Sequence, residues 1–375
     1  MNHQSYRICK RCVMDATDPE IMFYENGYCN HCTQALKKLR SLPSGQEKAN
    51  RLSALVEEIK EKGIKKKYDC IIGVSGGVDS SFVAYTVKQL GLRPLAIHLD
   101  NGWDSELAVK NIENICKKLE IDLYTHVIDW EEFKDLQLAF LRASTPDSEI
   151  PSDHAITAIL FQRALQEDVK YILIGTNTAT ESIGVNAWSQ GHADWKYIES
   201  VHRQFGTKQL ETFPHYSIFD LMKWKILNRV RLIRILDYID YDKLEAKGIL
   251  QKEICWKDYG DKHHESVYTK FFQAYILPTK FGFDKRKSHL SSLICAGQTT
   301  RDRALQELKK ELYPSQELKE NIDYVINKFG LSKEEFDSMM KTPPKTYWQY
   351  PNYKKTWYYK TGRAVYRVAR RLLHP

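Results

Sequence analysis

Residues 68–81 read Tyr-Asp-Cys-Ile-Ile-Gly-Val-Ser-Gly-Gly-Val-Asp-Ser-Ser, and this stretch decides the fold. Its first half is a short apolar run of the kind that forms a buried strand in a parallel sheet. Its second half is a turn rich in glycine and serine, and a helical pattern over residues 80–90 follows directly. A buried strand that passes through a glycine-rich turn into a helix is the repeating unit of α/β sheets.

The same alternation continues toward the C-terminus. Further short apolar runs lie at residues 94–99, 123–128 and 171–174, and helical patterns lie at residues 104–119, 130–141 and 152–166. Strands that alternate with helices predict an α/β fold with a doubly wound, mostly parallel sheet, whose ligands bind at the carboxyl ends of the strands.

After residue 215 the strand pattern fades. Helical patterns follow at residues 219–238, 266–276, 300–312 and 332–340, the last opening with Ser332 and Glu335 at capping-box spacing. We therefore predict four parts: a Cys-paired module (1–45), a sheet domain (60–215), a helical C-terminal lobe (216–345) and a basic, aromatic, amphipathic tail (346–375).

The turn after the first strand has the composition of a phosphate-binding loop. Backbone N–H groups at a helix N-terminus receive phosphate oxygens, glycine allows close approach, and serine hydroxyls add donors. Asp79 is better suited to hold Mg²⁺ than to face phosphate directly. The P-loop of kinases and GTPases requires a lysine that this turn lacks, so the device is a different one. The candidate nucleotide-binding residues here are Ser75, Gly76, Gly77, Asp79, Ser80 and Ser81.

The motif SGGxDS after a strand resembles the PP-loop of ATP pyrophosphatases, which grip the pyrophosphate of ATP and cleave between its α and β phosphates. That resemblance implies ATP and Mg²⁺ as cofactors. In the family's pattern the second and fourth strand ends lie near the nucleoside, which adds Asp100, Gly175 and Asn177 as binding residues. Read singly, each of the three segments is a glycine-rich or Asx turn. Their occurrence at three strand ends of one sheet favours the nucleotide site.

Four of the eight cysteines lie within the first 32 residues. Cys9 and Cys12 form one pair, Cys29 and Cys32 form another, and sixteen residues separate the pairs. This spacing is typical of a structural zinc site with four thiolate ligands, which would fold a module too small to bury its own core. A four-cysteine iron–sulfur cluster is the alternative occupant.

The positive charge of the chain is unevenly distributed. The formal net charge is +8, yet the last 22 residues contain no acid and seven basic residues, namely Lys354, Lys355, Lys360, Arg363, Arg367, Arg370 and Arg371. The nearly neutral body argues against nucleic acid as a partner. Neither a signal-peptide apolar stretch nor a membrane-spanning run is present, so we expect a cytoplasmic protein.

Over nearly its full length the chain resembles the N-acetyl sugar amidotransferase family of PP-loop enzymes. The resemblance rests on the cysteine pairs, on SGGVDSS, and on residues 151–155, 260–266 and 280–286. It implies conversion of an acetamido group on a nucleotide-linked sugar to an acetamidino group, in the biosynthesis of a surface glycan such as lipopolysaccharide. The amide oxygen would attack the α phosphate, pyrophosphate would leave, and ammonia would displace AMP. The chain contains no recognisable glutaminase, so the resemblance also implies a partner glutaminase subunit and a barrel-type subunit that channels ammonia.

Beyond Asp79, the catalytic candidates come from the second half of the chain. Lys285 and Arg286 belong to a cationic run suited to departing pyrophosphate, or to a solvated charged turn. Lys262, His264 and Glu265 are candidates for orienting the sugar or moving a proton from ammonia. A histidine in such a segment is also often structural.

The main rival function is tRNA modification by a PP-loop enzyme of the thiolation or lysidine type, since such enzymes also combine cysteine pairs with SGGxDS. A second rival is a zinc-knuckle binding module on an inactive nucleotide-binding body. The basic tail suits docking on a partner subunit, peripheral association with a membrane, or capping of the helical lobe.

Overall fold

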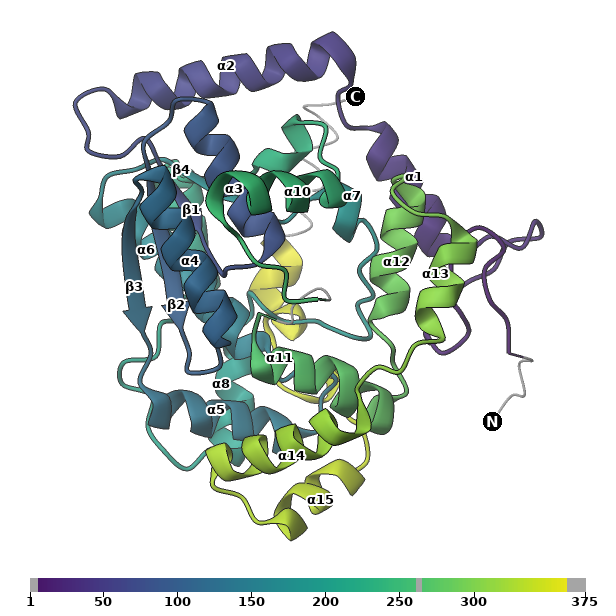
Figure 1. Cartoon of the computed structure of the whole chain (residues 1–375). Coiled ribbons are helices and arrows are strands. Elements are labelled where there is room, and N and C mark those ends of the chain that lie inside the picture. Colours follow the sequence, from purple (N-terminus) through teal and green to yellow (C-terminus); the bar gives the residue numbers. More distant parts are fainter. Residues whose placement is uncertain (1–5, 261–264, 363–375) are drawn as a thin grey trace.

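The computed structural model describes residues 6–260 and 265–362, which contain a five-stranded parallel sheet. The strands are β1 (Cys70–Gly73), β2 (Pro94–Asp100), β3 (Asp122–Val127), β4 (Tyr171–Ile174) and β5 (Arg231–Arg234). Their order is β3-β2-β1-β4-β5, so the chain winds outward from β1 in one direction and then in the other (Figure 1). The predicted doubly wound fold is confirmed, and its topological switch point lies between β1 and β4.

Helices cover both faces of the sheet because successive strand residues point to opposite sides. Cys70 and Ile72 face one core, while Ile71 between them faces the other, and all three are fully buried. The first core is completed by α2 (Gly45–Gly63), α3 (Val78–Gln89), α4 (Glu106–Leu119) and α10 (Lys243–Ile254). The second core is completed by α5 (Trp130–Ala143), α6 (Ile150–Gln166) and α8 (Trp195–Phe205).

The helix predicted over residues 219–238 is wrong, because this segment contains the fifth strand. It consists of α9 (Ile218–Met222), a π-helical turn (Lys223–Leu227), β5 and a 3₁₀ turn (Ile235–Tyr238). Arg229 has a φ of 55°, a left-handed conformation that ends the helical path. Within the described ranges β5 pairs with β4 alone, and of its four residues only Ile233 is buried. An edge strand of this kind carries arginines and lacks the continuous apolar run of a central strand.

The rest of the C-terminal half is helical, as predicted. It contains α11 (Val267–Phe271), which continues as a π-helical segment (Phe272–Phe281), then α12 (Arg286–Cys295), α13 (Arg301–Leu308), α14 (Ser315–Phe329) and α15 (Lys333–Lys341). The capping box at Ser332 and Glu335 is confirmed. Along the described residues no helix is both long and apolar enough to cross a membrane.

The aromatic part of the predicted tail belongs to the folded body. Tyr347, Tyr350 and Tyr353 are buried, and the Tyr347 hydroxyl donates to the Asp194 carboxylate at 2.5 Å. Tyr347 also packs edge-on against Tyr197 of α8. The basic end of the tail, from residue 363 onward, lies outside the described residues.

Candidate active site

The turn between β1 and α3 is held in place from below by two long-range hydrogen bonds. The carbonyl oxygen of Gly76 accepts from the Trp256 indole at 2.9 Å and from the Asn111 side-chain amide at 3.3 Å. Gly76 has a φ of +77°, and a Cβ placed there would lie 2.5 Å from the backbone oxygen of Ala108. Only glycine fits a left-handed position that is pressed against another backbone.

The upper side of the turn presents hydroxyls and backbone N–H groups at the N-terminus of α3. The Ser80 hydroxyl accepts from the Ser75 N–H at 3.2 Å and donates to the Gly77 carbonyl at 3.1 Å. Gly77 is the N-cap of α3, and the helix begins at Val78. Free N–H groups and the positive end of a helix dipole at this point favour an anion.

Two tyrosines from a distant segment contact the same turn, and no sequence motif indicated either of them. The Tyr259 hydroxyl accepts from the Val78 N–H at 3.1 Å, and the Tyr241 hydroxyl donates to the Asp79 carboxylate. Burial raises the pKa of both tyrosines, so both hydroxyls stay protonated. The two residues flank α10. A phosphate oxygen that takes the Val78 N–H must therefore displace the Tyr259 hydroxyl.

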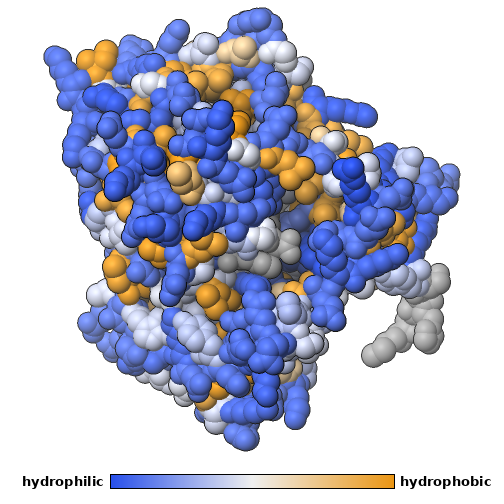
Figure 2. Space-filling model, viewed as in Figure 1, coloured by the Kyte–Doolittle hydropathy of each residue, from blue (hydrophilic) through white to orange (hydrophobic). Residues whose placement is uncertain are grey.

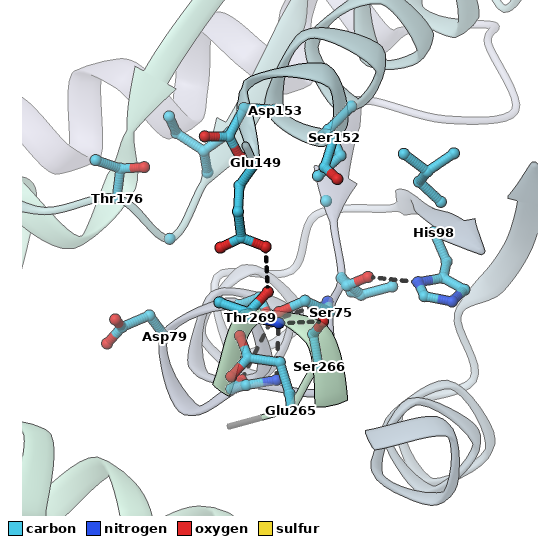
Figure 3. Close-up of a pocket in the computed structure, with 18 of the residues that line it drawn as sticks. Ser75, Asp79, His98, Glu149, Ser152, Asp153, Thr176, Glu265, Ser266 and Thr269 are labelled. Atoms are coloured by element: carbon cyan, nitrogen blue, oxygen red, sulfur yellow. Dashed lines mark hydrogen bonds between the residues drawn. The ribbon is translucent and has the colours of Figure 1, made fainter. Parts of the chain in front are cut away.

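A cavity of about 550 Å³ opens above the turn, at the carboxyl ends of the strands. Figure 3 shows its residues converging from the loop, from the ends of β2 and β4, from α6 and from α11. On the outer surface the molecule is hollowed beside the part that carries α12 and α13 (Figure 2). The position agrees with the rule that doubly wound sheets bind ligands at a topological switch point.

The structure brings seven of the fourteen predicted catalytic and nucleotide-binding residues to this cavity. The lining includes Ser75, Gly77, Asp79, Ser80, Gly175, Glu265 and Lys285. Gly76 belongs to the same turn but does not line the cavity, and its carbonyl oxygen contacts Trp256 and Asn111. Lys262 and His264 lie outside the described residues.

Three predicted nucleotide-binding residues point elsewhere. Ser81 is fully buried on α3, and Asn177 caps α7 (Thr178–Glu181) by accepting from the Thr180 N–H at 2.9 Å. The Asp100 carboxylate accepts from the Gly102 N–H in its own turn. The neighbours of Asp100 and Asn177 that do line the cavity are Asn101 and Thr176. A shift of one residue is enough to redirect a side chain at a strand end.

The three cationic residues at the start of α12 have contacts in three different parts of the structure. Lys285 lines the cavity. Arg286 pairs with Asp284 at 2.9 Å and donates to carbonyl oxygens near the end of α13, so it is not a cavity residue. Lys287 pairs with Asp15 of the N-terminal module at 2.5 Å. The predicted role of Arg286 at pyrophosphate therefore has no support in its position.

The cavity wall also carries Asp147, Asp153 and Ser189, which surround His192 on the loop before α8. The Nε2 atom of His192 lies 2.9 Å from the Ser189 hydroxyl and 3.4 Å from carboxylate oxygens of both Asp147 and Asp153. A nucleophilic triad needs the serine and the carboxylate on different ring nitrogens. All three partners share one nitrogen here, so the cluster is suited to binding hydroxyl and amide groups rather than to nucleophilic attack.

Two carboxylates of this wall have pKa values that differ widely. Burial alone would raise the pKa of Asp147, but the hydrogen bond with His192 and the charge of Lys285 outweigh it and lower the pKa to about 2. Burial raises the pKa of Glu149 to about 8, and the charges of Asp147 and Asp153 add to the rise. Such pairs with separated pKa values are characteristic of acid–base sites.

The four clustered cysteines lie apart from the cavity and have the geometry of a metal site. Their sulfur atoms all lie within 4.8 Å of one another, and all four side chains are fully buried. The Cys9–Cys32 and Cys12–Cys29 sulfur distances are 3.7 and 3.6 Å. A tetrahedron with Zn–S bonds of about 2.3 Å has edges of about 3.8 Å. The donor set and spacing therefore fit zinc.

The cysteine module is docked on the helix that begins beside the cavity. α12 lies between α1 (Asn30–Arg40) and α13 (Figure 1). The Val13 N–H donates to the Ser291 hydroxyl of α12 at 3.1 Å, and the Arg301 guanidinium donates to the carbonyl oxygens of Cys9 and Cys12. These contacts fix α12, and with it Lys285 at its start, relative to the sheet.

Two family models match separate parts of the chain. Residues 48–204 match NAD synthase, and residues 265–366 match the C-terminal domain of WbpG-like LPS biosynthesis proteins. The first match contains the glycine-rich turn, and the second begins at Glu265.

Curated relatives match at low identity. An uncharacterized protein of Methanocaldococcus jannaschii is 22% identical over 82% of this chain and 95% of its own length. A tRNA-specific 2-thiouridylase of Hahella chejuensis is 28% identical over 48% of this chain and 52% of its own length. A tRNA(Ile)-lysidine synthase of Chlamydia pneumoniae is 36% identical over 20% of this chain and 24% of its own length.

Proposed function

We propose that this chain, which joins a PP-loop domain to a WbpG-like C-terminal domain of lipopolysaccharide biosynthesis, is an AMP-forming amidotransferase. Its substrate is a nucleotide-linked sugar with an acetamido group, and its product carries an acetamidino group. The amide oxygen attacks the α phosphate of ATP and pyrophosphate leaves. Ammonia then displaces AMP from the activated carbon.

The observation that carries this proposal is that both matched regions line one cavity. Ser75 and Asp79, from the region like NAD synthase, line it. Thr269 and Lys285, from the WbpG-like region, line it too. Adenylation chemistry needs the nucleotide and the acceptor in contact, and a shared cavity provides that proximity.

Each side of the cavity has a distinct task in this reaction. Main-chain N–H groups at the start of α3 receive the pyrophosphate, and Asp79 would hold Mg²⁺, which neutralises phosphate charge. Lys285 adds a fixed positive charge near the wall of acids and hydroxyls. That wall suits the hydroxyl and amide groups of a sugar, because charge-assisted hydrogen bonds to carboxylates orient such groups.

Replacement of Asp79 by alanine is expected to lower AMP formation about 10²- to 10³-fold, the usual cost of removing one electrostatic contact to a reacting phosphate. The assay combines protein, ATP, Mg²⁺, ammonium and a panel of acetamido sugars on different nucleotide carriers, and mass spectrometry follows conversion of the amide to the amidine. Asp240→Asn is the control, since its side chain is 94% exposed and pairs with Lys48. Full activity of the Asp79→Ala protein contradicts the proposed role of the loop.

We also propose that a glutaminase subunit and a barrel-type subunit supply the ammonia. The isolated chain is then expected to use ammonium but not glutamine, and glutamine-dependent turnover should appear only when both partner subunits are added. Turnover with glutamine by the purified chain alone overturns this expectation. The mass-spectrometric assay described above measures both.

A tRNA-modifying function is the second candidate, because the thiouridylase and the lysidine synthase match parts of the chain. Thiolation chemistry of the kind that uses cysteine nucleophiles needs a thiol at the nucleotide site. Among the described residues, the lining of the cavity includes no cysteine. AMP formation that depends on tRNA and not on acetamido sugars would favour this alternative.

A further inference from the structure

We infer that Glu149 is the proton acceptor of the ammonia step, so that its carboxylate takes the proton that ammonia must lose as it replaces AMP. The inference rests on the proposed function and assigns a catalytic role to a residue that the family resemblance and the sequence motifs did not indicate. It follows from the position of Glu149, from its hydrogen bond and from the charges around it.

Glu149 lies at the start of α6 and extends into the middle of the cavity. In Figure 3 its carboxylate points away from Asp153 on α6 and toward Thr269 on α11, and the loop residue Ser75 lines the same cavity. The Thr269 hydroxyl donates to Glu149 Oε1 at 2.6 Å. One carboxylate oxygen is thereby oriented, and the group lines the same cavity as the loop residues Ser75 and Asp79 and the acids Asp147 and Asp153. A catalytic base must lie within reach of the reacting centre in this way.

The charges around Glu149 come from three elements. Asp147 precedes it on the same turn and accepts from its backbone N–H at 2.9 Å, while Asp153 lies one helical turn further along α6. Lys285 at the N-cap of α12 and His192 on the loop before α8 complete the surroundings. Lys285 lowers the pKa of both Asp147 and Glu149, but only Asp147 also has the histidine bond.

This arrangement separates the two carboxylates by function. Asp147 remains ionised at neutral pH because its pKa is held near 2. Glu149 exchanges its proton near neutral pH because burial, with Asp147 and Asp153, raises its pKa to about 8. A general base works best when its pKa lies near the operating pH.

In the ammonia step, the nitrogen lone pair of ammonia forms a bond to the adenylated carbon, and the π pair of the C=N bond at that carbon moves to the sugar nitrogen. This gives a tetrahedral centre that carries –NH₃⁺. Glu149 takes one proton from this nitrogen. The bond between the carbon and the AMP oxygen then breaks, and its electron pair leaves with AMP. The remaining nitrogen lone pair forms the C=N bond, and the product is the protonated amidine.

Glu149→Gln is expected to lower amidine formation from ammonium about 10²- to 10³-fold, the usual contribution of a general base. It should leave acceptor-dependent ATP–pyrophosphate exchange within a few-fold of wild type, because adenylation comes before ammonia. Glutamine has nearly the same shape, so its oxygen still accepts from Thr269. The matched control is Glu167→Gln at the other end of α6, where the carboxylate lies outside the cavity lining.

The pH profile gives a signature that a structural role would not produce. Rates are expressed per un-ionised ammonia, which removes the titration of ammonia itself. The wild-type rate should then rise with pH and level off near pH 8, the pKa of Glu149. In Glu149→Gln this rise of the rate with pH should be absent. In Thr269→Val the rise in rate should move to higher pH. The hydrogen bond from Thr269 lowers the pKa of Glu149 in the native protein, so its loss should raise that pKa.

The outcomes separate this inference from the proposed function. If the wild-type protein makes no amidine from any acetamido sugar in a panel that covers the different nucleotide carriers, the proposed function fails, whatever Glu149 does. If wild type makes amidine and Glu149→Gln keeps its rate or the rise of its rate with pH, the assignment of Glu149 is wrong. Equal losses in pyrophosphate exchange and in amidine formation would also overturn it, since a base for ammonia acts only in the second half.

Discussion

Substitution of Gly175 by alanine is expected to reduce AMP formation by at least about 10²-fold without removing any polar group, because a displacement of 1 Å near the chemistry costs that much. Gly175 follows β4 and packs directly against the first turn of α3. A Cβ placed there would lie 2.9 Å from the Asp79 carbonyl carbon and 2.9 Å from the Ser80 nitrogen. Both atoms are backbone and cannot rotate aside. The loop and the start of α3 would therefore have to move.

The control for this substitution is Gly248→Ala on α10, where an added Cβ has no heavy atom within 4 Å. That protein should retain wild-type turnover and should be slightly more stable, since alanine favours a helix over glycine by about 1 kcal/mol. Steady-state AMP formation and thermal unfolding are measured for both variants. Wild-type activity of Gly175→Ala would mean that the first turn of α3 does not position the nucleotide.

Cys12→Ser is expected to abolish metal binding and to destabilise the N-terminal module severely, because structural zinc contributes about 10–16 kcal/mol to the folding of comparable peptides. We propose zinc as the occupant of the four thiolates. Activity should fall as well, since the module is docked on α12 through Ser291 and through the ion pair between Lys287 and Asp15. Lys285, at the start of α12, would lose its fixed position in the cavity.

Elemental analysis and thermal unfolding test this expectation, with Cys255→Ser as the control. Cys255 is exposed and has a φ of 56° that serine adopts equally well, so that variant should keep its metal, its stability and its activity. One equivalent of zinc in wild type and none in Cys12→Ser supports the proposal. Iron, acid-labile sulfide and visible absorbance would instead indicate an iron–sulfur cluster.

The central strands and the loop could be predicted because their signals are local. Strands buried on both faces leave continuous apolar runs, and the glycine-rich turn between residues 74 and 78 follows such a run without a gap. The cysteine pairs are equally local, because their spacing is set by the reach of a single metal ion. In contrast, β5 has one buried residue out of four, so its arginines mask its strand character.

The contacts that complete the site could not be predicted, because they join residues far apart in the chain. Tyr241 and Tyr259 reach the loop across 162 and 181 residues. Glu149 stands just ahead of a Pro-Ser-Asp-His motif, and nothing in the sequence shows that Thr269 will meet it from 120 residues away. Arg286 was predicted as a site residue but does not line the cavity. A cationic run in the sequence indicates charge, but it does not indicate which of its side chains faces the cavity.

His154 in the Pro-Ser-Asp-His motif also contacts residues that lie far from it in the sequence. His154 is fully buried, its Nδ1 lies 2.7 Å from the His192 carbonyl oxygen, and its Nε2 accepts from the Tyr216 N–H at 3.2 Å. Burial lowers its pKa to about 4, so the ring is neutral, and these two bonds place the proton on Nδ1. It stacks on Tyr216 as a packed core residue and supports α6, which carries Glu149.

The most direct test of the central claim is the identity of the products formed from ATP. Protein, Mg²⁺, ammonium, acetamido nucleotide sugars and ATP labelled at the α phosphate are incubated together, and the labelled product is separated by chromatography. If the turn beginning at Ser75 holds the pyrophosphate, label appears in AMP and one pyrophosphate accompanies each AMP. Label in ADP, with release of orthophosphate, would show cleavage at the γ phosphate and would contradict the account.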